Sequence, residues 1–357
     1  MWQDRRFLDL VGIEIPIVQA PMAGSVTAEM VIAVSEAGGL GSLPCAMLNP
    51  EQLRTELGII RQRTARPINV NFFCHAPPQR DGRREAAWKE RLTPYYAELG
   101  IDPDAQPSGP ARAPFDDAMC DAVLEFRPEV VSFHFGLPDQ RLLRRVKESG
   151  AKVLSSATSV AEARALEAQG CDAIIAQGYE AGGHRGMFLT DDIASLAGTM
   201  ALLPQVVDAV RVPVIAAGGI ADGRGIVAAL ALGASAVQIG TAYLFCPEAK
   251  VGAAHRAALN SANESATVLT NVFTGRPARG IVNRIVREVG PMSQHAPAFP
   301  LAATGVGPLR SKGEAAGSGD FTPFWSGQAA ALGRELPAGE LTRTLASEAA
   351  ERLAALR

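Results

Sequence analysis

Residues 212–240, VPVIAAGGIADGRGIVAALALGASAVQIG, contain two short apolar runs separated by a segment of helical length. The runs Val212–Ala217 and Ala236–Gly240 are rich in Val, Ile and Ala, which favours buried β-strands. Gly233 stands where the helix between them is expected to end. A strand, a helix and a second strand in this order form the βαβ unit of a parallel sheet.

The same unit recurs along the chain. The sequence contains eight such apolar runs, at residues 17–21, 40–44, 68–73, 130–135, 152–156, 173–177, 212–217 and 236–240. A helix-length segment follows almost every run, and helices are expected over residues 27–37, 50–63 and 160–169. Eight strands close a (β/α)8 barrel, so the sequence predicts this α/β fold, the TIM barrel. A doubly wound open sheet is the alternative, because periodicity does not report closure.

Two stretches interrupt the repeat. His75–Pro114 is rich in proline, and we interpret it as an insertion of loop character around a short helix near Arg83–Arg91. Residues 246–321 follow the eighth run and are interpreted as a lid or substrate subdomain over the barrel mouth. The barrel itself is then expected to comprise residues 1–245 together with 322–357.

The lid segment has its own expected elements. It begins with a helix over residues 248–260, continues with an extended segment over 266–273, and becomes rich in Pro and Gly from Gly290. The last segment, 324–357, is rich in Ala, Leu and Glu and is expected to return as helices against the barrel.

Composition narrows the class of function. The chain has 357 residues, a net charge of −3, 47% hydrophobic and 20% charged residues, so it can bury a large core and has no basic excess for binding nucleic acid. Asp9 and Glu14 interrupt any apolar core of an export signal, and no apolar run is long enough to cross a bilayer, so we expect a cytoplasmic protein. The five cysteines show no paired metal-ligand spacing, so we expect reduced thiols and no metal site.

Polar side chains stand near the carboxyl ends of several predicted strands, which is where barrels carry their chemistry. Asn71 lies in the third run, Gln177 ends the sixth, and Gln238 lies in the eighth. Amide groups offer both donors and acceptors without charge, which suits the edge of a neutral heterocycle. Some of these amides could instead satisfy strand-end backbone groups.

The seventh and eighth runs end in signals for a phosphate site. Gly218 and Gly219 follow the seventh run, and Gly240 and Thr241 end the eighth. The loops after these two strands form the usual phosphate pocket of barrels, where glycine lets backbone N–H groups approach the oxygens. The glycines could also serve only as turn residues. A phosphate-bearing ligand with a large neutral ring indicates FMN.

Five motifs in order give a specific resemblance. They are QAPMAG at 19–24, NVNFF at 69–73, VSFHFG at 131–136, AQGYEAGGHRG at 176–186 and AAGGI at 216–220. The chain resembles the nitronate monooxygenase family, formerly the 2-nitropropane dioxygenases, from Ile17 to about Phe245, and WSGQ at 325–328 resembles a further family segment. The resemblance implies an FMN-dependent barrel that oxidises alkyl nitronates with O2 to a carbonyl compound and nitrite.

The resemblance also implies roles for individual residues. His184 matches the catalytic histidine, and an imidazole there can bind a nitronate anion or remove the α-proton of its nitroalkane parent. His134 is expected either to contact substrate or to make a core hydrogen bond, and Phe299 and Lys312 stand in the lid region that faces substrate in similar proteins. The expected cofactor-binding residues are Ala20, Pro21, Met22, Asn71, Gln177, Gly182, Gly183, Ala217, Gly218, Gly219, Gln238, Ile239, Gly240 and Thr241.

Two other functions remain open at this point. The same scaffold and FMN pocket serve reductases that pass hydride from NAD(P)H to a quinone or an enoyl thioester. A non-redox barrel that acts on a phosphorylated metabolite would use the phosphate pocket alone. The substrate itself is left open between propionate 3-nitronate and a simple alkyl nitronate.

Overall fold

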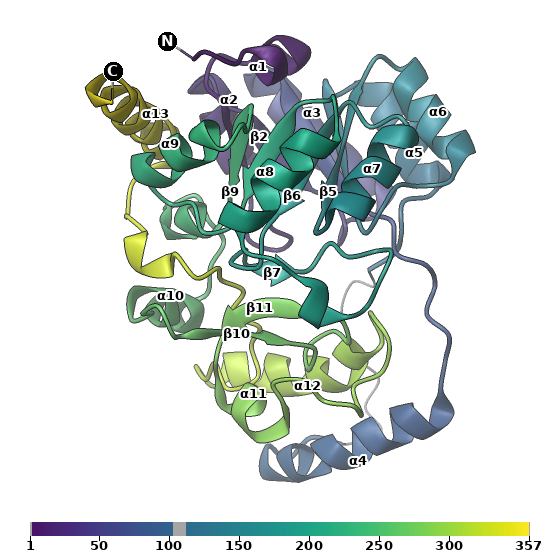
Figure 1. The fold of residues 1–357 in the computed structure, drawn as a ribbon. Helices are drawn as coiled ribbons and strands as arrows, with labels where there is room; N and C mark the ends of the chain where they lie inside the picture. Colours follow the sequence, from purple (N-terminus) through teal and green to yellow (C-terminus); the bar gives the residue numbers. More distant parts are fainter. Residues whose placement is uncertain (1, 103–111, 357) are drawn as a thin grey trace.

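Eight parallel strands form a closed barrel in the upper part of the molecule (Figure 1). Their order is β1, β9, β8, β6, β5, β4, β3 and β2, and a bridge between Val18 and Leu40 joins the two ends. This computed structural model describes residues 2–102 and 112–356. The barrel strands are Ile17–Gln19 (β1), Gly41–Pro44 (β2), Ile68–Phe73 (β3), Val130–His134 (β4), Lys152–Ala157 (β5), Ala173–Gln177 (β6), Val214–Ala217 (β8) and Ala236–Ile239 (β9). The predicted (β/α)8 barrel is confirmed.

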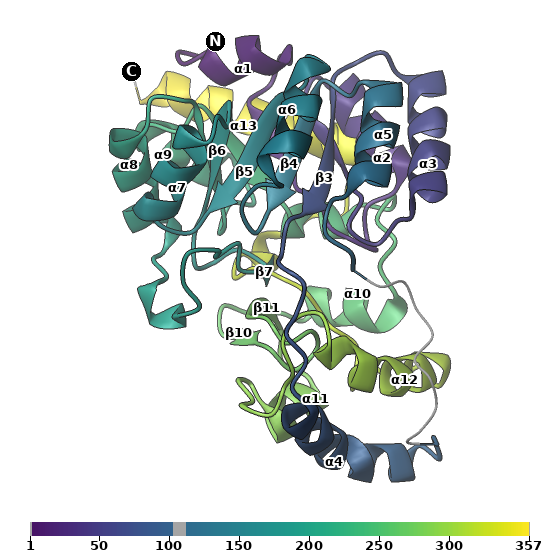
Figure 2. The same cartoon turned by 90° about the vertical axis from the view of Figure 1, so that its right-hand side faces the viewer.

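Helices cover the outside of the barrel (Figure 2). They are Ala28–Glu36 (α2), Pro50–Arg63 (α3), Asp117–Phe126 (α5), Gln140–Glu148 (α6), Val160–Ala168 (α7), Thr199–Ala209 (α8), Gly223–Ala231 (α9) and Ala338–Ala355 (α13). The start of α3 shows why the sequence folds this way, because Asn49 and Gln52 exchange side-chain to backbone hydrogen bonds as a capping box. The last helix, α13, packs against α2 and α9, as expected for the returning C-terminal segment.

A short N-terminal helix closes the barrel at the end opposite the lid. This helix, Arg6–Val11 (α1), buries Phe7 and Leu8 against the first residues of several strands, including Val130 and Leu154. Apolar side chains thus fill the interior of the barrel at the end that α1 covers. The carboxyl ends of the strands face the other way, toward the lid.

The lid subdomain, which we define as residues 82–101 and 253–322, lies beyond the carboxyl ends of the barrel strands (Figure 1). A three-stranded antiparallel sheet joins it to the barrel, with β11 between β10 and β7. Its elements are Gly82–Glu98 (α4), Ala253–Asn260 (α10), Thr267–Thr270 (β10), Ala278–Ile281 (β11), Arg284–Val289 (α11) and Ala302–Ala315 (α12), while β7 (Gly183–His184) comes from the barrel chain. Short 3₁₀ turns occur at Ile193–Ser195 (η1), Thr241–Phe245 (η2) and Ala330–Leu332 (η3).

The structure corrects the expected character of the insertion after β3. Residues 82–98 form a long helix, α4, rather than a short helix in a loop, and this helix packs on α12 as part of the lid subdomain. Trp88 and Leu92 are buried there, and α12 approaches them closely at Gly305, where a Cβ would meet Leu92 Cδ1 at 2.9 Å. Tyr96 Oη donates a hydrogen bond of 2.6 Å to the carbonyl oxygen of Gly305. The subdomain therefore draws on two distant parts of the chain, and the expected boundaries 246–321 omit one of them.

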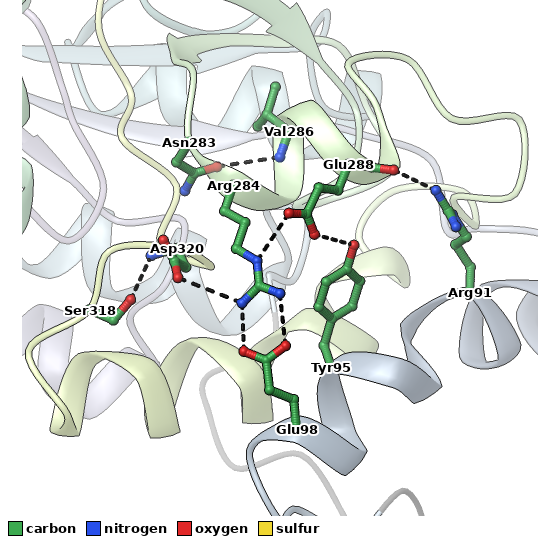
Figure 3. A network of polar contacts seen from close by, with 9 residues as sticks. All are labelled: Arg91, Tyr95, Glu98, Asn283, Arg284, Val286, Glu288, Ser318 and Asp320. Carbon is green, nitrogen blue, oxygen red and sulfur yellow. Dashed lines mark hydrogen bonds and ion pairs between the residues drawn. The ribbon is translucent and has the colours of Figure 1, made fainter.

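A network of polar contacts also connects α4 to α11 in the lid subdomain (Figure 3). Arg284 on α11 makes a bidentate ion pair with Glu98 on α4, at 2.6 and 2.7 Å. Its Nε bonds Glu288, and Glu288 in turn accepts a hydrogen bond of 2.9 Å from Tyr95 Oη. Because Glu98 and Glu288 are both partly exposed, we expect this network to orient α4 while the apolar contacts supply most of the stability.

Replacing Trp88 by Ala tests whether apolar contacts, rather than the polar network, supply most of the stability of the lid subdomain. Trp88 is 2% exposed, and its Nε1 donates to the carbonyl oxygen of Ala302. Trp88→Ala should therefore lower the free energy of unfolding of the lid subdomain by about 3–5 kcal/mol and expose α4 to trypsin. Urea titration and timed proteolysis would measure both effects. Arg284→Met is the control, and a loss as large as that of Trp88→Ala would contradict the assigned roles.

Candidate functional site

A cavity lies between the carboxyl ends of the barrel strands and the lid subdomain. The barrel loops after β1, β6, β8 and β9 line it, and Trp325, Ser326 and Gly327 line it from the chain that returns from the lid. Of the residues singled out from sequence, the lining includes Ala20, Pro21, Met22, Asn71, His134, Gln177, Gly182, Gly183, His184, Ala217, Gly218, Gly219, Gln238, Gly240 and Thr241. The fold therefore brings the five sequence motifs to one place.

Three expected site residues lie away from the lining. Ile239 is fully buried in the barrel core. Phe299 stands behind His184, with its ring centroid 5.3 Å from the imidazole. Lys312 is exposed on α12 and is absent from the lining, so the structure does not support its expected contact with substrate.

The loop that carries His184 is fixed by strand pairing and a buried arginine. His184 pairs with Ala278 and Gly183 with Arg279, which joins the barrel loop to the lid sheet. Arg185 is fully buried and donates to the carbonyl oxygens of Gly178 and Ala181, at 2.8 and 2.6 Å. A guanidinium offers five donors in a rigid fork, so one side chain can brace several turns of backbone.

Arg185 and Glu180 have separate partners, although both lie in the same loop. Arg185 bonds backbone carbonyls, as described above. Glu180 accepts hydrogen bonds from the backbone N–H and the hydroxyl of Thr199, and so stabilises the start of α8. Both residues hold the His184 loop in place and neither is presented to solvent as an ion pair.

Two side chains converge on the backbone carbonyl of His184. Gln177 Nε2 donates to it at 3.0 Å, and Gln177 Oε1 accepts from Gly186 N at 2.8 Å. His134 Nε2 lies 3.2 Å from the same oxygen, and its Nδ1 lies 2.6 Å from Ser156 Oγ. Both polar atoms of Gln177 and both ring nitrogens of His134 are thus committed to protein groups. Of the two roles left open for His134, the geometry favours the internal hydrogen bond.

The His184 ring lies in an apolar enclosure. Its Nε2 is 3.0 Å from Thr274 Oγ1, and the rings of Phe73, Phe299 and Trp325 surround it at centroid distances of 6.1, 5.3 and 5.4 Å. Burial, and then the nearby charge of Arg112, hold the pKa of His184 well below its ordinary value of 6.5. The imidazole is therefore neutral at pH 7, and its Nδ1 has no hydrogen-bond partner among the described residues.

Glycines line the other end of the cavity, and a side chain at two of them would crowd a neighbour or strain the backbone. A Cβ on Gly218 would approach Ala181 N at 3.0 Å, and Gly219 adopts a φ of +72°, which L side chains rarely adopt. Gly240 stands beside Met22, whose sulfur a Cβ would meet at 3.6 Å. Nearby, Gln238 Oε1 is buried and lacks a partner among the described residues. An acceptor without a partner in a cavity indicates that a ligand donor completes it.

Sequence reasoning missed several residues that the structure brings to this cavity. Arg112 and His255 line it, and Thr274 reaches His184 from the loop after β10. None follows a barrel strand, so the strand-end rule could not find them. Trp325 belongs to the WSGQ segment that family resemblance had marked, and the structure gives this segment a place beside His184.

The cysteines, possible metal ligands and possible membrane spans can also be compared with the structure. The five cysteines are free, and burial raises the pKa of Cys45 and Cys74, so neither is poised as a thiolate. Within residues 2–102 and 112–356 no group of three or more His, Cys, Asp or Glu side chains could hold a metal ion. The described helices include none with the length and apolar character needed to span a bilayer.

Comparison with known proteins identifies the family of the chain. The family described as Nitronate monooxygenase matches residues 4–348. A nitronate monooxygenase of Pseudomonas aeruginosa is 45% identical over 345 residues, which cover 96% of this chain and 98% of the relative. The chain belongs to the nitronate monooxygenase family. This family is an oxidoreductase family and is in general flavin-dependent.

Two solved structures extend the comparison. A nitroalkane oxidase from Streptomyces ansochromogenes superposes with a TM-score of 0.90 at 41% identity, covering 99% of this chain and 100% of that one. FabK from Thermotoga maritima superposes with a TM-score of 0.76 at 32% identity, covering 99% of this chain and 98% of that one. This nitronate monooxygenase family member is therefore closer in fold and sequence to the nitroalkane oxidase than to FabK.

The buried histidines predict loss of stability in acid. Burial is the first cause that lowers the pKa of His75 to about 4, His134 to about 3 and His255 to about 4, below the 6.5 expected in the unfolded chain. Unfolding then takes up protons, so stability is full above pH 6.5 and falls as the pH drops toward 4. Urea midpoints between pH 7.5 and 4.5 would show this slope. His255→Gln should make the slope shallower, and an unchanged slope would contradict the assignment.

Proposed function

We propose that this protein is an FMN-dependent enzyme that oxidises alkyl nitronates with O2 to a carbonyl compound and nitrite. The observation that carries the proposal is a neutral His184, held in an apolar enclosure beside a glycine-lined cavity, in a chain of the nitronate monooxygenase family. The similar structure titled nitroalkane oxidase supports the same class of substrate. Membership of this family weighs against the alternative of a non-redox barrel. The cytoplasmic location expected from the sequence stays a prediction.

The residues at the cavity fit FMN. The backbone at Gly218, Gly219 and Gly240 offers the close approach that a phosphate needs, in the loops that follow β8 and β9. Gln238 Oε1, which lacks a protein donor among the described residues, suits an N–H group of the flavin ring. Asn71 lines the same cavity and is held by Ser132 Oγ at 2.9 Å. When bound, FMN would supply the redox chemistry of the reaction.

His184 is the side chain best placed to act on the substrate. With Nε2 held by Thr274, Nδ1 is the ring nitrogen left to meet a ligand. A neutral imidazole can hydrogen-bond a nitronate oxygen or accept a proton from carbon. A pKa well below 6.5 gives little driving force for the second task, because general bases work best when their pKa lies near the working pH. We therefore expect preformed nitronates to be better substrates than neutral nitroalkanes.

The cofactor assignment can be tested at Gly240. This residue lines the cavity and has a negative φ of −109°, so a side chain there enters the cavity without backbone strain. Gly240→Val should yield folded protein with little bound FMN, because the side chain occupies the position of the ligand. Absorbance of the purified protein and of the released flavin would measure occupancy. Gly58→Ala, whose Cβ meets nothing within 4 Å, is the matched control and should retain FMN.

The reaction itself is tested by adding substrates to the FMN-loaded enzyme. Under anaerobic conditions a nitronate should bleach the flavin absorbance, and O2 should then restore it with release of nitrite. NADH in place of the nitronate distinguishes the reductase alternative, since a reductase is reduced readily by NADH and not by the nitronate. Fast reduction by NADH alone would overturn the proposed function.

His184→Asn separates the two roles of the imidazole. Asn retains a hydrogen-bond donor but cannot serve as a base. Oxidation of a nitroalkane should fall by about 10²-fold or more, the usual contribution of positioned proton transfer, while a substantial part of nitronate oxidation remains. Oxygen consumption with matched nitroethane and ethylnitronate solutions gives both rates. Wild-type rates on both substrates would show that His184 is structural.

A further inference from the structure

The charge distribution of the cavity singles out one side chain. Among the described residues that line the cavity, Arg112 is the only one with a permanent charge, and no Asp, Glu or Lys lines it. The other ionisable liners are His134, His184 and His255. An anionic substrate needs an opposite charge or several donors to offset the loss of its hydration.

The histidines do not supply that charge at pH 7. Burial is the first cause that lowers the pKa of His134 to about 3 and of His255 to about 4, and it lowers the pKa of His184 well below 6.5. Arg112 adds to the effect on His184, which places the guanidinium within electrostatic reach of that ring. A guanidinium stays protonated under these conditions. Arg276 and Arg185 also lower the pKa of His184, but neither lines the cavity. Among the described lining residues, the positive charge therefore belongs to Arg112.

Arg112 has no acidic partner in the part of the chain that the structure describes. No ion pair joins its guanidinium to a described carboxylate, whereas four arginines of the barrel surface, Arg54, Arg61, Arg63 and Arg66, form such pairs. Burial, and then repulsion from the charge of Arg310, lowers the pKa of Arg112. A partly buried cation without a counter-charge is costly, and a bound anion would remove that cost.

We propose that Arg112 supplies the positive charge that binds the anionic nitronate, while His184 acts beside it in its neutral form. This inference rests on the proposed function and assigns the binding of the substrate charge to a residue outside the sequence motifs. A nitronate shares its negative charge between two oxygens of one planar group. The planar guanidinium presents paired N–H donors that match two such oxygens. A neutral nitroalkane lacks the net charge and gains less from Arg112.

The proposal can be tested by ligand binding alone. Nitrate is a planar, unreactive anion whose charge is shared among its oxygens, so it serves as the probe. Isothermal titration of the FMN-loaded enzyme at low ionic strength should show nitrate affinity about 10- to 100-fold weaker in Arg112→Met than in the wild type, the range expected for charge-assisted hydrogen bonds. Arg112→Lys keeps the charge and should recover part of the affinity. Arg83→Met, at an exposed arginine on α4, is the control and should bind nitrate like the wild type.

Steady-state kinetics supplies a second readout. The KM for ethylnitronate should rise about 10-fold or more in Arg112→Met, with a smaller change for nitroethane. Arg112→Gln gives the same test if the Met variant does not retain FMN. Unchanged nitrate affinity and unchanged KM in an FMN-loaded variant would overturn the assignment to Arg112. Failure of the wild type to oxidise any nitronate would instead overturn the proposed function, and the nitrate titration would still report whether Arg112 binds an anion.

Discussion

The pairing of β7 with β11 is the contact on which the site depends. Two residues of a barrel loop, Gly183 and His184, join the lid sheet opposite Arg279 and Ala278. Without this pairing the histidine would stand on a free loop of a kind that barrels commonly use for function. With it, the backbone of His184 is held by the lid on one side and by Gln177 from the barrel on the other. A side chain between two rigid elements keeps the alignment that catalysis requires.

The pairing of β7 with β11 also explains why the apolar enclosure of His184 combines residues of the barrel with residues of the lid subdomain. Phe73 comes from the barrel, whereas Thr274 and Phe299 come from the lid subdomain. Removing water from around an imidazole disfavours its charged form, so the lid contributes to the neutral state of His184 as well as to its position. The glycines after β8 and β9 line the same cavity as His184 and Trp325. A ligand held by those glycines would therefore share one cavity with the side chain proposed to act on the substrate.

The sequence predicted the barrel well and the lid poorly, for a physical reason. Buried parallel strands such as β6 and β9 read as short apolar runs, and their carboxyl ends mark the ligand side without further information. By contrast, α12 contains Gly305, Gly307 and Pro308 and reads as irregular chain, yet it is helical because it packs on α4. Tertiary packing overrides local propensity there. Arg112 and Thr274 escaped notice for a related reason, since they lie in irregular segments whose position depends on the lid.

The two-segment construction of the lid also bears on how the chain folds as it is synthesised. The apolar face of α4, with Trp88, Leu92 and Tyr96, packs against residues near 285–309 and Phe321. Since a ribosome adds about 5–20 residues per second, this face waits roughly 10–40 s before its partners exist. During that interval the barrel strands from β4 onward can assemble while an exposed amphipathic helix remains attached to them. During synthesis the apolar face of α4 is therefore exposed and can associate with other chains. This risk of aggregation ends when α12 has been made and packs on α4.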